Sequence, residues 1–521
     1  MPKKAKYTSE QLRAQYPIFT YLKYNWQLID HDDGQCDLEL TFVYTLGDSY
    51  TFTHHVTLYQ VERQHLERQQ AGLIDNLAFH LGIVEGFSYW KLTASPQYVI
   101  AAGSLSSRQL QYWHEWLING MSEYFYVNQI NFTAPDFVTI TNAQPKPEER
   151  GWTTYHLRPS HQGRHSLVNL GGGKDSAVML DLLGKAGEKC GAFIIAPNSP
   201  AAETQATLAS LPIHRARRVF DPQLRQLNDQ GFLNGHVPFS ASVAFIDLLA
   251  MVAYDYNYAL VGNEASADEV SLTWLDQPIN HQYSKSTKFE RSFFEYRREY
   301  LINRVEYFSF LRIFNEFQIA HIFCSNPKYW TVTRSCNRGQ RQNIWCHQCA
   351  KCLFVYLLLA AHLPLKTVAS DIFDHDLLDD ERLAPLLEEL LGLRPSKPLE
   401  CVGTREECQV AFYLVYTKCV QESQPLPKLI ARYYRQILLL HNDWLSLVDK
   451  LYTFFNYQAF KQSEMAQLRT VPAPCHFLMA DWAVPIVLAA HEQVLHDSYE
   501  ILKNLYEEQL PKVKSKKDGD V

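Results

Sequence analysis

The first 145 residues show two hydrophobic periodicities, one typical of strands and one typical of helices. Between residues 35 and 60, apolar and polar side chains alternate on both sides of a Gly47-Asp48 turn. This alternation predicts a β-hairpin with one buried face. An apolar run at residues 98–102 predicts another strand, and residues 105–126 carry the spacing of an amphipathic helix. We therefore expect a small α+β domain here.

Short apolar segments alternate with helical patterns in the middle of the chain. The segments at residues 165–170, 191–196 and 259–264 each have the length of a buried strand. Helical patterns at residues 175–183 and 241–254 lie between them. Strands and helices that alternate at this spacing predict an α/β core, with a parallel sheet and crossover helices.

Leucine-rich helical patterns dominate the chain after about residue 370 and continue to about residue 505. A polar stretch with two prolines, residues 141–150, has the composition of a linker. These boundaries divide the chain into three expected regions. They are an N-terminal α+β domain at residues 1–145, a parallel-sheet domain at residues 150–370 and a helical C-terminal region at residues 371–521.

Composition and charge narrow the class of protein. The net charge is −7, and the one basic tract, residues 511–517, is short and followed by acidic residues, so we expect a solvated chain end and no nucleic-acid partner. No apolar run is long enough to span a membrane, and no secretory signal is recognisable. These features predict a cytoplasmic protein whose eleven cysteines are thiols or metal ligands rather than disulfides.

Three consecutive glycines, Gly171, Gly172 and Gly173, separate the predicted strand at residues 165–170 from the following helix. Glycines here let the backbone approach a ligand closely, and the amides that begin a helix attract anions. Lys174 is followed by Asp175, so the loop matches neither the Walker A pattern nor the dinucleotide pattern. A divalent metal ion bridging Asp175 to phosphates explains the acidic residue. The alternative is a tight turn without a ligand.

The six residues from Gly171 to Ser176 resemble the PP-loop of the ATP pyrophosphatase superfamily. Gly171 replaces the serine that usually begins this motif, which agrees with a smaller branch that carries three glycines. The resemblance implies a PP-loop core that cleaves ATP between its α- and β-phosphates. It also implies that Ser176 and the amides of the three glycines hold the diphosphate, and that Asp175 binds Mg²⁺. Lys174 either adds positive charge at the site or caps the surface.

Further motifs, spread over about residues 35–420, resemble one family, the ATP-dependent UDP-N-acetylmuramoyl-L-alanyl-L-glutamate epimerases of peptidoglycan synthesis. The resemblance implies adenylation of the terminal L-glutamate, inversion of its α-carbon, and release of AMP and diphosphate. The partner implied is therefore a small UDP-sugar dipeptide. The oligomeric state stays open. The motifs lie at residues 86–91, 120–128, 233–240, 262–267, 280–286 and 397–404.

Several polar residues in these motifs are candidates for the chemistry. Glu264, at the end of a predicted strand, is either a metal ligand or base, or a buried structural carboxylate. His236 either contacts substrate or shapes its turn, and Cys401 is either an acid/base thiol or a small buried side chain. A polar cluster suited to an anionic substrate is the last candidate, the alternative being a solvated loop, and it consists of His281, Tyr283 and Lys285.

Four cysteines at short spacing, Cys336, Cys346, Cys349 and Cys352, form the second strong motif. Four thiolates suit a tetrahedral structural zinc ion, since they leave no position open for water. The spacing is also similar to the zinc motif of the PP-loop enzymes that make 7-cyano-7-deazaguanine. Chance proximity is the alternative, and Cys324 is a fifth thiol nearby.

Three other functions compete with the epimerase. The zinc pattern favours an enzyme similar to the 7-cyano-7-deazaguanine synthases, although the extra N-terminal domain and the long C-terminal helices disfavour it. An RNA-modifying PP-loop protein is disfavoured by the acidic balance. A non-catalytic nucleotide-binding module is disfavoured by the intact Lys174-Asp175-Ser176 sequence.

Overall fold

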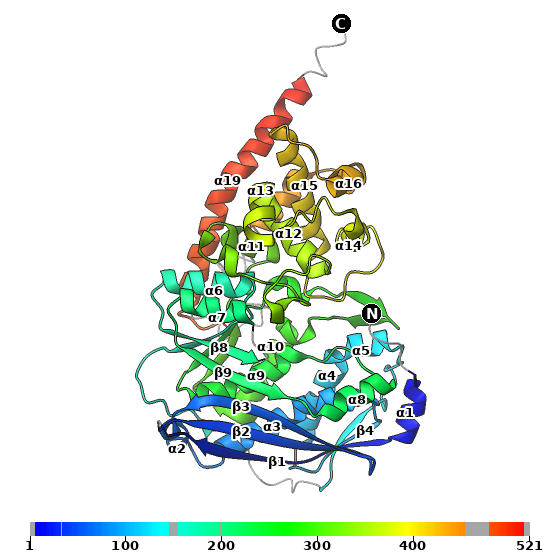
Figure 1. The fold of residues 1–521 in the computed structure, drawn as a ribbon, viewed down its shortest axis with the longest axis vertical. Helices are drawn as coiled ribbons and strands as arrows, with labels where there is room; N and C mark the ends of the chain where they lie inside the picture. Colours follow the sequence, from blue (N-terminus) through cyan, green and yellow to red (C-terminus); the bar gives the residue numbers. More distant parts are fainter. Residues whose placement is uncertain (1–5, 33, 145–154, 197–198, 454–478, 515–521) are drawn as a thin grey trace.

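The computed structural model describes residues 6–32, 34–144, 155–196, 199–453 and 479–514. In these residues the chain is a mixed α/β protein with a large, mostly parallel sheet and a helical C-terminal region (Figure 1). The second half of the predicted linker and the end of the basic tail lie outside the described residues. No helix in the described ranges is both long enough and apolar enough to cross a membrane.

Ten strands form one continuous sheet. In chain order they are β1 (Ile18–Asp30), β2 (Cys36–Leu46), β3 (Tyr50–Val61), β4 (Gln97–Ile100), β5 (Thr139–Asn142), β7 (Ser166–Asn169), β8 (Cys190–Ala196), β9 (Ile213–Val219), β10 (Tyr258–Val261) and β14 (Glu306–Ser309). Their order across the sheet is β14-β10-β7-β8-β9-β3-β2-β1-β4-β5. The first five run parallel, as the α/β pattern predicts. Two small ladders lie outside this sheet and pair β11 (Leu272–Trp274) with β12 (Gln277–Ile279), and β6 (Tyr155–His156) with β13 (Ile302–Asn303).

The predicted hairpin is confirmed as β2 and β3, and alternate residues of β2 are buried, as a sheet with one face on the core requires. β3 also pairs with β9 in antiparallel register, with Val56 opposite Arg218. This pairing joins the strands of residues 18–142 to those of residues 166–309. One sheet therefore crosses the boundary expected near residue 145.

Two hydrophobic cores lie on the two faces of this sheet, because adjacent strand residues point to opposite sides. Leu167 of β7 belongs to one core and Val168 to the other. The first core contains side chains of α3 (Leu73–Trp90), α4 (Ser107–Gly120), α5 (Ser122–Val127), α9 (Phe239–Ala253) and α10 (Thr287–Tyr296). The second contains those of α6 (Lys174–Lys185), α7 (Pro200–Leu208), α11 (Glu316–Cys324) and α12 (Ala350–His362).

The second core continues into the C-terminal helices, which lie above α6 and α7 in Figure 1. The helical C-terminal region predicted from the leucine pattern is thereby confirmed. Its main helices are α14 (Ala384–Leu390), α15 (Arg405–Gln421), α16 (Lys428–Leu438), α17 (Trp444–Thr453) and α19 (Val484–Lys514). Elsewhere the described residues also form α1 (Ser9–Gln15), α2 (Arg63–Glu67), α8 (Pro222–Gln230) and α13 (Leu365–Thr367), besides short 3-10 and π-helical turns.

The prediction of a single helix over residues 105–126 is wrong, because the structure breaks it into α4 and α5 at Met121. Met121 has φ −97° and ψ 8°, outside the helical region. Gly120 lies against Pro238, where an added Cβ would come within 2.9 Å of the proline ring. The close approach of a distant loop is invisible to hydrophobic periodicity, and the break redirects α5 and its Glu123.

A buried ionic cluster lies where β3 meets β9. Arg218 of β9 donates to Glu85 of α3 (Nε to Oε1, 2.9 Å), and His54 Nε2 of β3 is 3.2 Å from Glu85 Oε2. The side chains of Glu85 and His54 are fully buried. Burial alone would raise the pKa of Glu85, but Arg218 and His54 outweigh it and hold the pKa at about 2. The two halves of the sheet are thus joined by charge as well as by backbone hydrogen bonds.

Replacing Glu85 with glutamine tests this junction. Removing one partner leaves Arg218 buried without its counter-charge, so we expect Glu85→Gln to lower the free energy of unfolding in urea by about 3 kcal/mol. Asp30→Asn, which breaks the exposed pair between Asp30 and Arg63, is the control and should lower the free energy of unfolding far less, because solvent screens that pair. The contribution of a carboxyl with a lowered pKa is lost on acidification. The difference in the free energy of unfolding between wild type and Glu85→Gln should therefore decrease as the pH falls from about 4.5 to about 2. Equal effects of the two substitutions would contradict this role.

Candidate functional site

The three glycines connect β7 to α6, and Gly173 is the N-cap of that helix. We call Gly171–Gly173 the glycine loop. Gly172 has φ +79°, and an added Cβ would lie 2.5 Å from Ser199 Oγ and 2.7 Å from the Ala202 backbone nitrogen. Both the left-handed backbone and the lack of space therefore require glycine at this position.

The segment that follows Val332 braces the glycine loop. The Arg334 N–H donates to the carbonyl of Gly172 (2.8 Å), and Gln340 Nε2 donates to the carbonyl of Gly171 (2.6 Å). The Lys174 N–H donates to Ser335 Oγ (3.1 Å). The loop conformation therefore depends on residues more than 150 positions later in the chain.

Inside the loop, Ser176 Oγ accepts a hydrogen bond from the Gly171 N–H (3.0 Å). The predicted phosphate ligands Ser176 and Gly171 thus bond to each other in this structure. Their bond closes the first turn of α6 back on the end of β7.

A cleft of about 1270 Å³ opens beside the glycine loop. It is bounded by Gly171, the carboxyl ends of β8 and β9, the start of α9 and residues 337–342. Ligands of parallel α/β sheets bind at this edge. Arg215 and Arg218 pair with Glu203 and Glu85, but the lining still carries an excess of positive charge suited to an anionic ligand. The arginines that line the cleft are Arg215, Arg217, Arg218, Arg338 and Arg341.

Lys174 is fully buried, which rules out the surface-cap interpretation. Its Nζ forms ion pairs with Asp175 and with Glu316 of α11, and Lys351 Nζ of α12 lies 3.3 Å from the other oxygen of Glu316. Burial lowers the pKa of Lys174, but the nearby Asp175 and Glu316 raise it by more. The net effect is a raised pKa, so the lysine stays charged. Burial opposes ionisation of Glu316, yet Lys174 and Lys351 hold its pKa at about 2.

Glu264 follows β10 at the carboxyl edge of the sheet, as predicted, and is only 2% exposed. Burial, with Glu316 adding repulsion, raises the pKa of its carboxyl to about 7. Lys285 opposes this rise, and the pKa of Lys285 is itself raised by Cys401 and Glu264 despite burial. Arg312 donates to the backbone carbonyls of Glu264 and Lys285 and so ties their two segments together.

A second polar group surrounds His281. Its Nδ1 is hydrogen-bonded to Glu123 Oε2, and its Nε2 lies 3.7 Å from Cys401 Sγ. The ring of His236 lies 4.5 Å from the His281 ring, centroid to centroid. The structure thus brings together His236, His281 and Cys401, while Tyr283 is directed into the core with its ring 6.0 Å from that of Phe289.

The protonation states in this group are set by burial, by its own members and by two neighbouring lysines. Although burial opposes it, Lys285 and His281 lower the pKa of Cys401 to about 6. Burial likewise opposes charge on His281, yet Cys401 and Glu123 raise its pKa to about 9. Burial, together with His281 and Lys91, lowers the pKa of His236 to about 3. At neutral pH the arrangement therefore holds a thiolate, an imidazolium and a neutral imidazole.

Sequence reasoning missed three charged residues of this region, Glu123, Glu316 and Lys351. Each is at most 8% exposed. Glu316 and Lys351 stand beside apolar runs, and a charge in such a run is a signal of a buried pair. Glu123 lies within the motif at residues 120–128, but only the folded chain shows that it faces His281.

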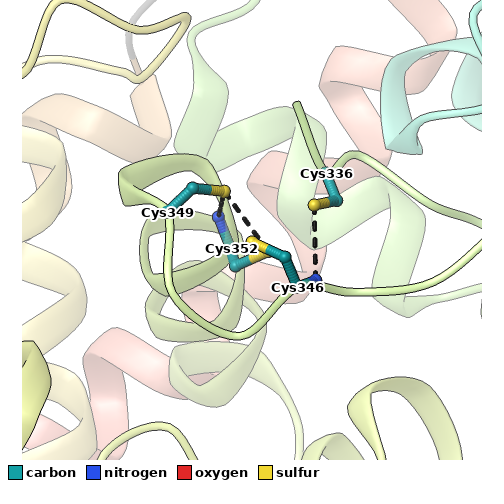
Figure 2. A group of neighbouring side chains, drawn as sticks. All are labelled: Cys336, Cys346, Cys349 and Cys352. Atoms are coloured by element: carbon teal, nitrogen blue, oxygen red, sulfur yellow. Dashed lines mark hydrogen bonds between the residues drawn. The ribbon is translucent and has the colours of Figure 1, made fainter. Parts of the chain in front are cut away.

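The four cysteines of the second motif converge on one point (Figure 2). Their sulfurs all lie within 4.8 Å of one another, with 3.5 Å between Cys349 and Cys352 and 3.8 Å between Cys346 and Cys352. Sulfurs at the corners of a tetrahedron with metal bonds of about 2.3 Å are about 3.8 Å apart.

Backbone amides support these sulfurs. Gly339 and Cys346 N–H groups donate to Cys336 Sγ (3.0 and 3.3 Å), and the Cys352 N–H donates to Cys349 Sγ (3.4 Å). Such bonds stabilise thiolates, so the group suits a metal ion. Cys324, in α11, is buried and is not part of the group.

Two family domains match this chain, and together they contain the glycine loop and the cysteine group. Residues 12–310 match the MurL N-terminal domain, and residues 332–436 match the MurL C-terminal domain. The first match contains the glycine loop, and the second contains the four cysteines and Cys401.

Three curated relatives carry the name UDP-N-acetyl-alpha-D-muramoyl-L-alanyl-L-glutamate epimerase. The Micromonospora sp. protein is 34% identical over 342 residues, which cover 64% of this chain and 73% of the relative. The Salinispora tropica protein is 32% identical over 412 residues, 78% of this chain and 86% of the relative. The Xanthomonas oryzae pv. oryzae protein is 31% identical over 359 residues, 68% and 77% of the two chains. Two domain matches across most of the chain and three relatives at this identity show that the protein belongs to the MurL family.

Proposed function

We propose that this protein inverts the terminal L-glutamate of UDP-N-acetylmuramoyl-L-alanyl-L-glutamate to D-glutamate, using ATP and releasing AMP and diphosphate. The observation that carries the proposal is the family membership, together with the names of the three epimerase relatives. The arginine-lined cleft beside the glycine loop supports it, because both ATP and a UDP-linked substrate are strongly anionic.

We assign ATP to the cleft, with its outer phosphates at the glycine loop. In this proposal residues 150–370 form the PP-loop domain. The amides of Gly171–Gly173 and the hydroxyl of Ser176 are the diphosphate ligands. Asp175 is part-exposed in the first turn of α6, where a carboxylate fits a phosphate-bound Mg²⁺. When bound, Mg²⁺ neutralises charge on the phosphates. Lys174 supplies fixed positive charge beneath the loop.

The chemistry follows from the charge of the substrate. A carboxylate resists loss of its α-proton, because the carbanion would add a second negative charge beside the first. Transfer of AMP to the carboxylate removes the existing charge and lets the carbonyl accept the new electron pair. Inversion then needs two proton-transfer groups on opposite faces of the carbon.

The candidates for proton transfer are Glu264, His236 and Cys401. A pKa of about 7 suits Glu264 for accepting or donating a proton near neutral pH. Lys285 is cationic and is assigned to neutralise a carboxylate of the substrate, and the charge on His281 adds to the positive potential beside it. Tyr283 is assigned a supporting role for its neighbour Lys285 rather than a contact with the substrate, because its ring is directed into the core.

The cysteine group is assigned a structural zinc ion. The four thiolates leave no open position for a reacting water. The metal-bearing segment also supplies Arg334, Ser335 and Gln340, which brace the glycine loop. Zinc therefore stabilises the ATP site without taking part in the reaction.

The same cysteine group favours one second candidate, an enzyme similar to the 7-cyano-7-deazaguanine synthases, which also activates a carboxylate with ATP. The two candidates differ in product. Only the epimerase returns an amino acid of inverted configuration.

The proposed function is tested by incubating the purified protein with UDP-N-acetylmuramoyl-L-alanyl-L-glutamate, ATP and Mg²⁺ in D₂O. We expect AMP and diphosphate in the solution, and D-glutamate with deuterium at its α-carbon after hydrolysis of the product. Phosphorus NMR measures AMP and diphosphate, and chiral chromatography with mass spectrometry measures the deuterated D-glutamate. Formation of ADP, or of AMP without any inversion, would rule the proposal out.

Asp175→Asn tests the metal assignment. The amide removes the negative charge that Mg²⁺ needs, so we expect AMP release to fall at least about 100-fold. Lys174 keeps its ion pair with Glu316, so the fold should survive. The matched control is Asp181→Asn, a carboxylate on the same helix that pairs with Lys185. AMP release that is lowered equally by both substitutions, or by neither, would show that Asp175 does not bind the metal.

Removal of the metal tests the zinc assignment. We expect one zinc per chain by elemental mass spectrometry, and loss of most of it in Cys349→Ser, whose hydroxyl is a poor zinc ligand. Because the brace of the glycine loop depends on this segment, the affinity for ATP should fall in parallel. Cys324→Ser is the control and should keep its zinc, since Cys324 lies outside the group. A zinc content that Cys349→Ser leaves unchanged would overturn the assignment.

A further inference from the structure

Glu123, His281 and Cys401 form a continuous hydrogen-bonded chain from three distant parts of the sequence. Glu123 lies in α5, His281 precedes the turn at Tyr283–Lys285, and Cys401 precedes α15. His281 uses Nδ1 for Glu123 and turns Nε2 toward Cys401 Sγ, 3.7 Å away. The imidazole therefore connects a buried carboxylate to a thiol.

Two functions are compatible with this cluster, a metal site and a proton-transfer unit, and the hydrogen bonds of His281 distinguish them. Ligand atoms of Glu123, His236 and His281 lie within 4.8 Å of one another, which is close enough for a metal ion. Both nitrogens of His281 are already engaged, however, one by the carboxylate and one by the thiol. A carboxylate that orients an imidazole, which in turn faces a nucleophilic atom, is the arrangement of proton-transfer units.

We propose that Cys401 is the group that exchanges a proton with the α-carbon of the activated glutamyl residue on one face, and that His281 and Glu123 position it. This inference rests on the proposed function. By its exposed surface Cys401 is part-exposed, whereas Glu123 is only 8% exposed.

The step balances in atoms and electrons. The Cys401 thiolate takes the α-hydrogen as a proton, so an S–H bond forms as the C–H bond breaks. The electron pair of that bond moves onto the carbonyl of the acyl-adenylate. A proton returned from a group on the opposite face completes the inversion, and in the next cycle the thiol loses its proton to solvent. A thiolate is a competent base here because adenylation has already acidified the carbon.

The surroundings favour the thiolate form. Lys285, His281 and Lys351 face Cys401 as positive charges, while Glu123 and His236 face His281. These charges lower the pKa of Cys401 to about 6, despite burial. The positions of Lys285 and Glu264 in one electrostatic group also place the thiol near the carboxyl edge of the sheet, where the reaction is assigned.

Cys401→Ser is the direct test, in the D₂O assay with wild type as reference. We expect the ratio of D-glutamyl product to AMP to fall at least about 100-fold, because the adenylate forms and is hydrolysed without inversion. Deuterium exchange should be lost from one of the two epimers when each is supplied as substrate. Cys190→Ser is the matched control. Cys190 is a part-buried thiol at the first residue of β8, away from the cleft at the other end of that strand, and burial raises its pKa to about 12.

The positioning role of His281 has its own readout. In wild type, alkylation of Cys401 by iodoacetamide, followed by peptide mass spectrometry, should show a midpoint near pH 6. His281→Gln removes the adjacent cation, so we expect the midpoint to rise by at least about one pH unit. Glu123→Gln should raise it in the same direction by less. A merely structural role of His281 would leave the midpoint unchanged in the folded variant.

The outcomes separate this inference from the function on which it rests. A wild-type protein that releases no AMP and inverts nothing contradicts the proposed function. A wild-type protein that inverts its substrate, together with Cys401→Ser that keeps the wild-type ratio of product to AMP, overturns only the role of Cys401. Detection of the substrate bound to Cys401 as a thioester would overturn it as well, in favour of covalent catalysis.

Discussion

The buried charge of Lys174 is the constraint on which the site depends. An ammonium group taken out of water costs several kcal/mol unless anions surround it, and Asp175 and Glu316 provide them. Glu316 in turn needs Lys351, which belongs to the helix that begins at the cysteine group. The start of α6, the start of α11 and the start of α12 are therefore held in one arrangement, because any displacement would leave a charge without its partner. The glycine loop inherits its position from this network.

The cysteine group constrains the same loop from the other side. Residues 334–340 lie between the first two cysteines or next to them, and they donate to or accept from the backbone of the glycine loop at three points. A loop with a left-handed residue and no side chains of its own has little to keep it in one conformation. The cysteine group and the buried ion pairs supply that order from outside. This explains why a PP-loop-like segment and a cysteine motif, separated by about 160 residues of sequence, occur in one functional unit.

The sequence predicted several local elements of the fold, although not β1, β9, β14 or α3, and it predicted few contacts between elements. The hairpin, the parallel strands and the C-terminal helices each have a periodicity that depends on neighbours in the chain. At the break before α5, Gly120 lies against Pro238, more than a hundred residues away, and no periodicity records such a contact. Glu264 was placed correctly at the strand end, because that rule is also local. Glu123 was missed as a partner of His281, since the two residues are far apart in the sequence and only the folded chain brings them into contact.

The two histidines of the site show how far folded context, rather than residue type, decides chemistry. His236 and His281 lie 4.5 Å apart, ring to ring, yet the pKa of one is lowered to about 3 and that of the other raised to about 9. Burial lowers the pKa of His236, and the charge on His281 lowers it further, whereas at His281 the contacts with Cys401 and Glu123 outweigh burial. Adjacent groups with opposing pKa shifts are characteristic of acid–base sites. This separation of pKa values, together with the hydrogen bonds that join Glu123, His281 and Cys401, supports the proposed role of the group in proton transfer.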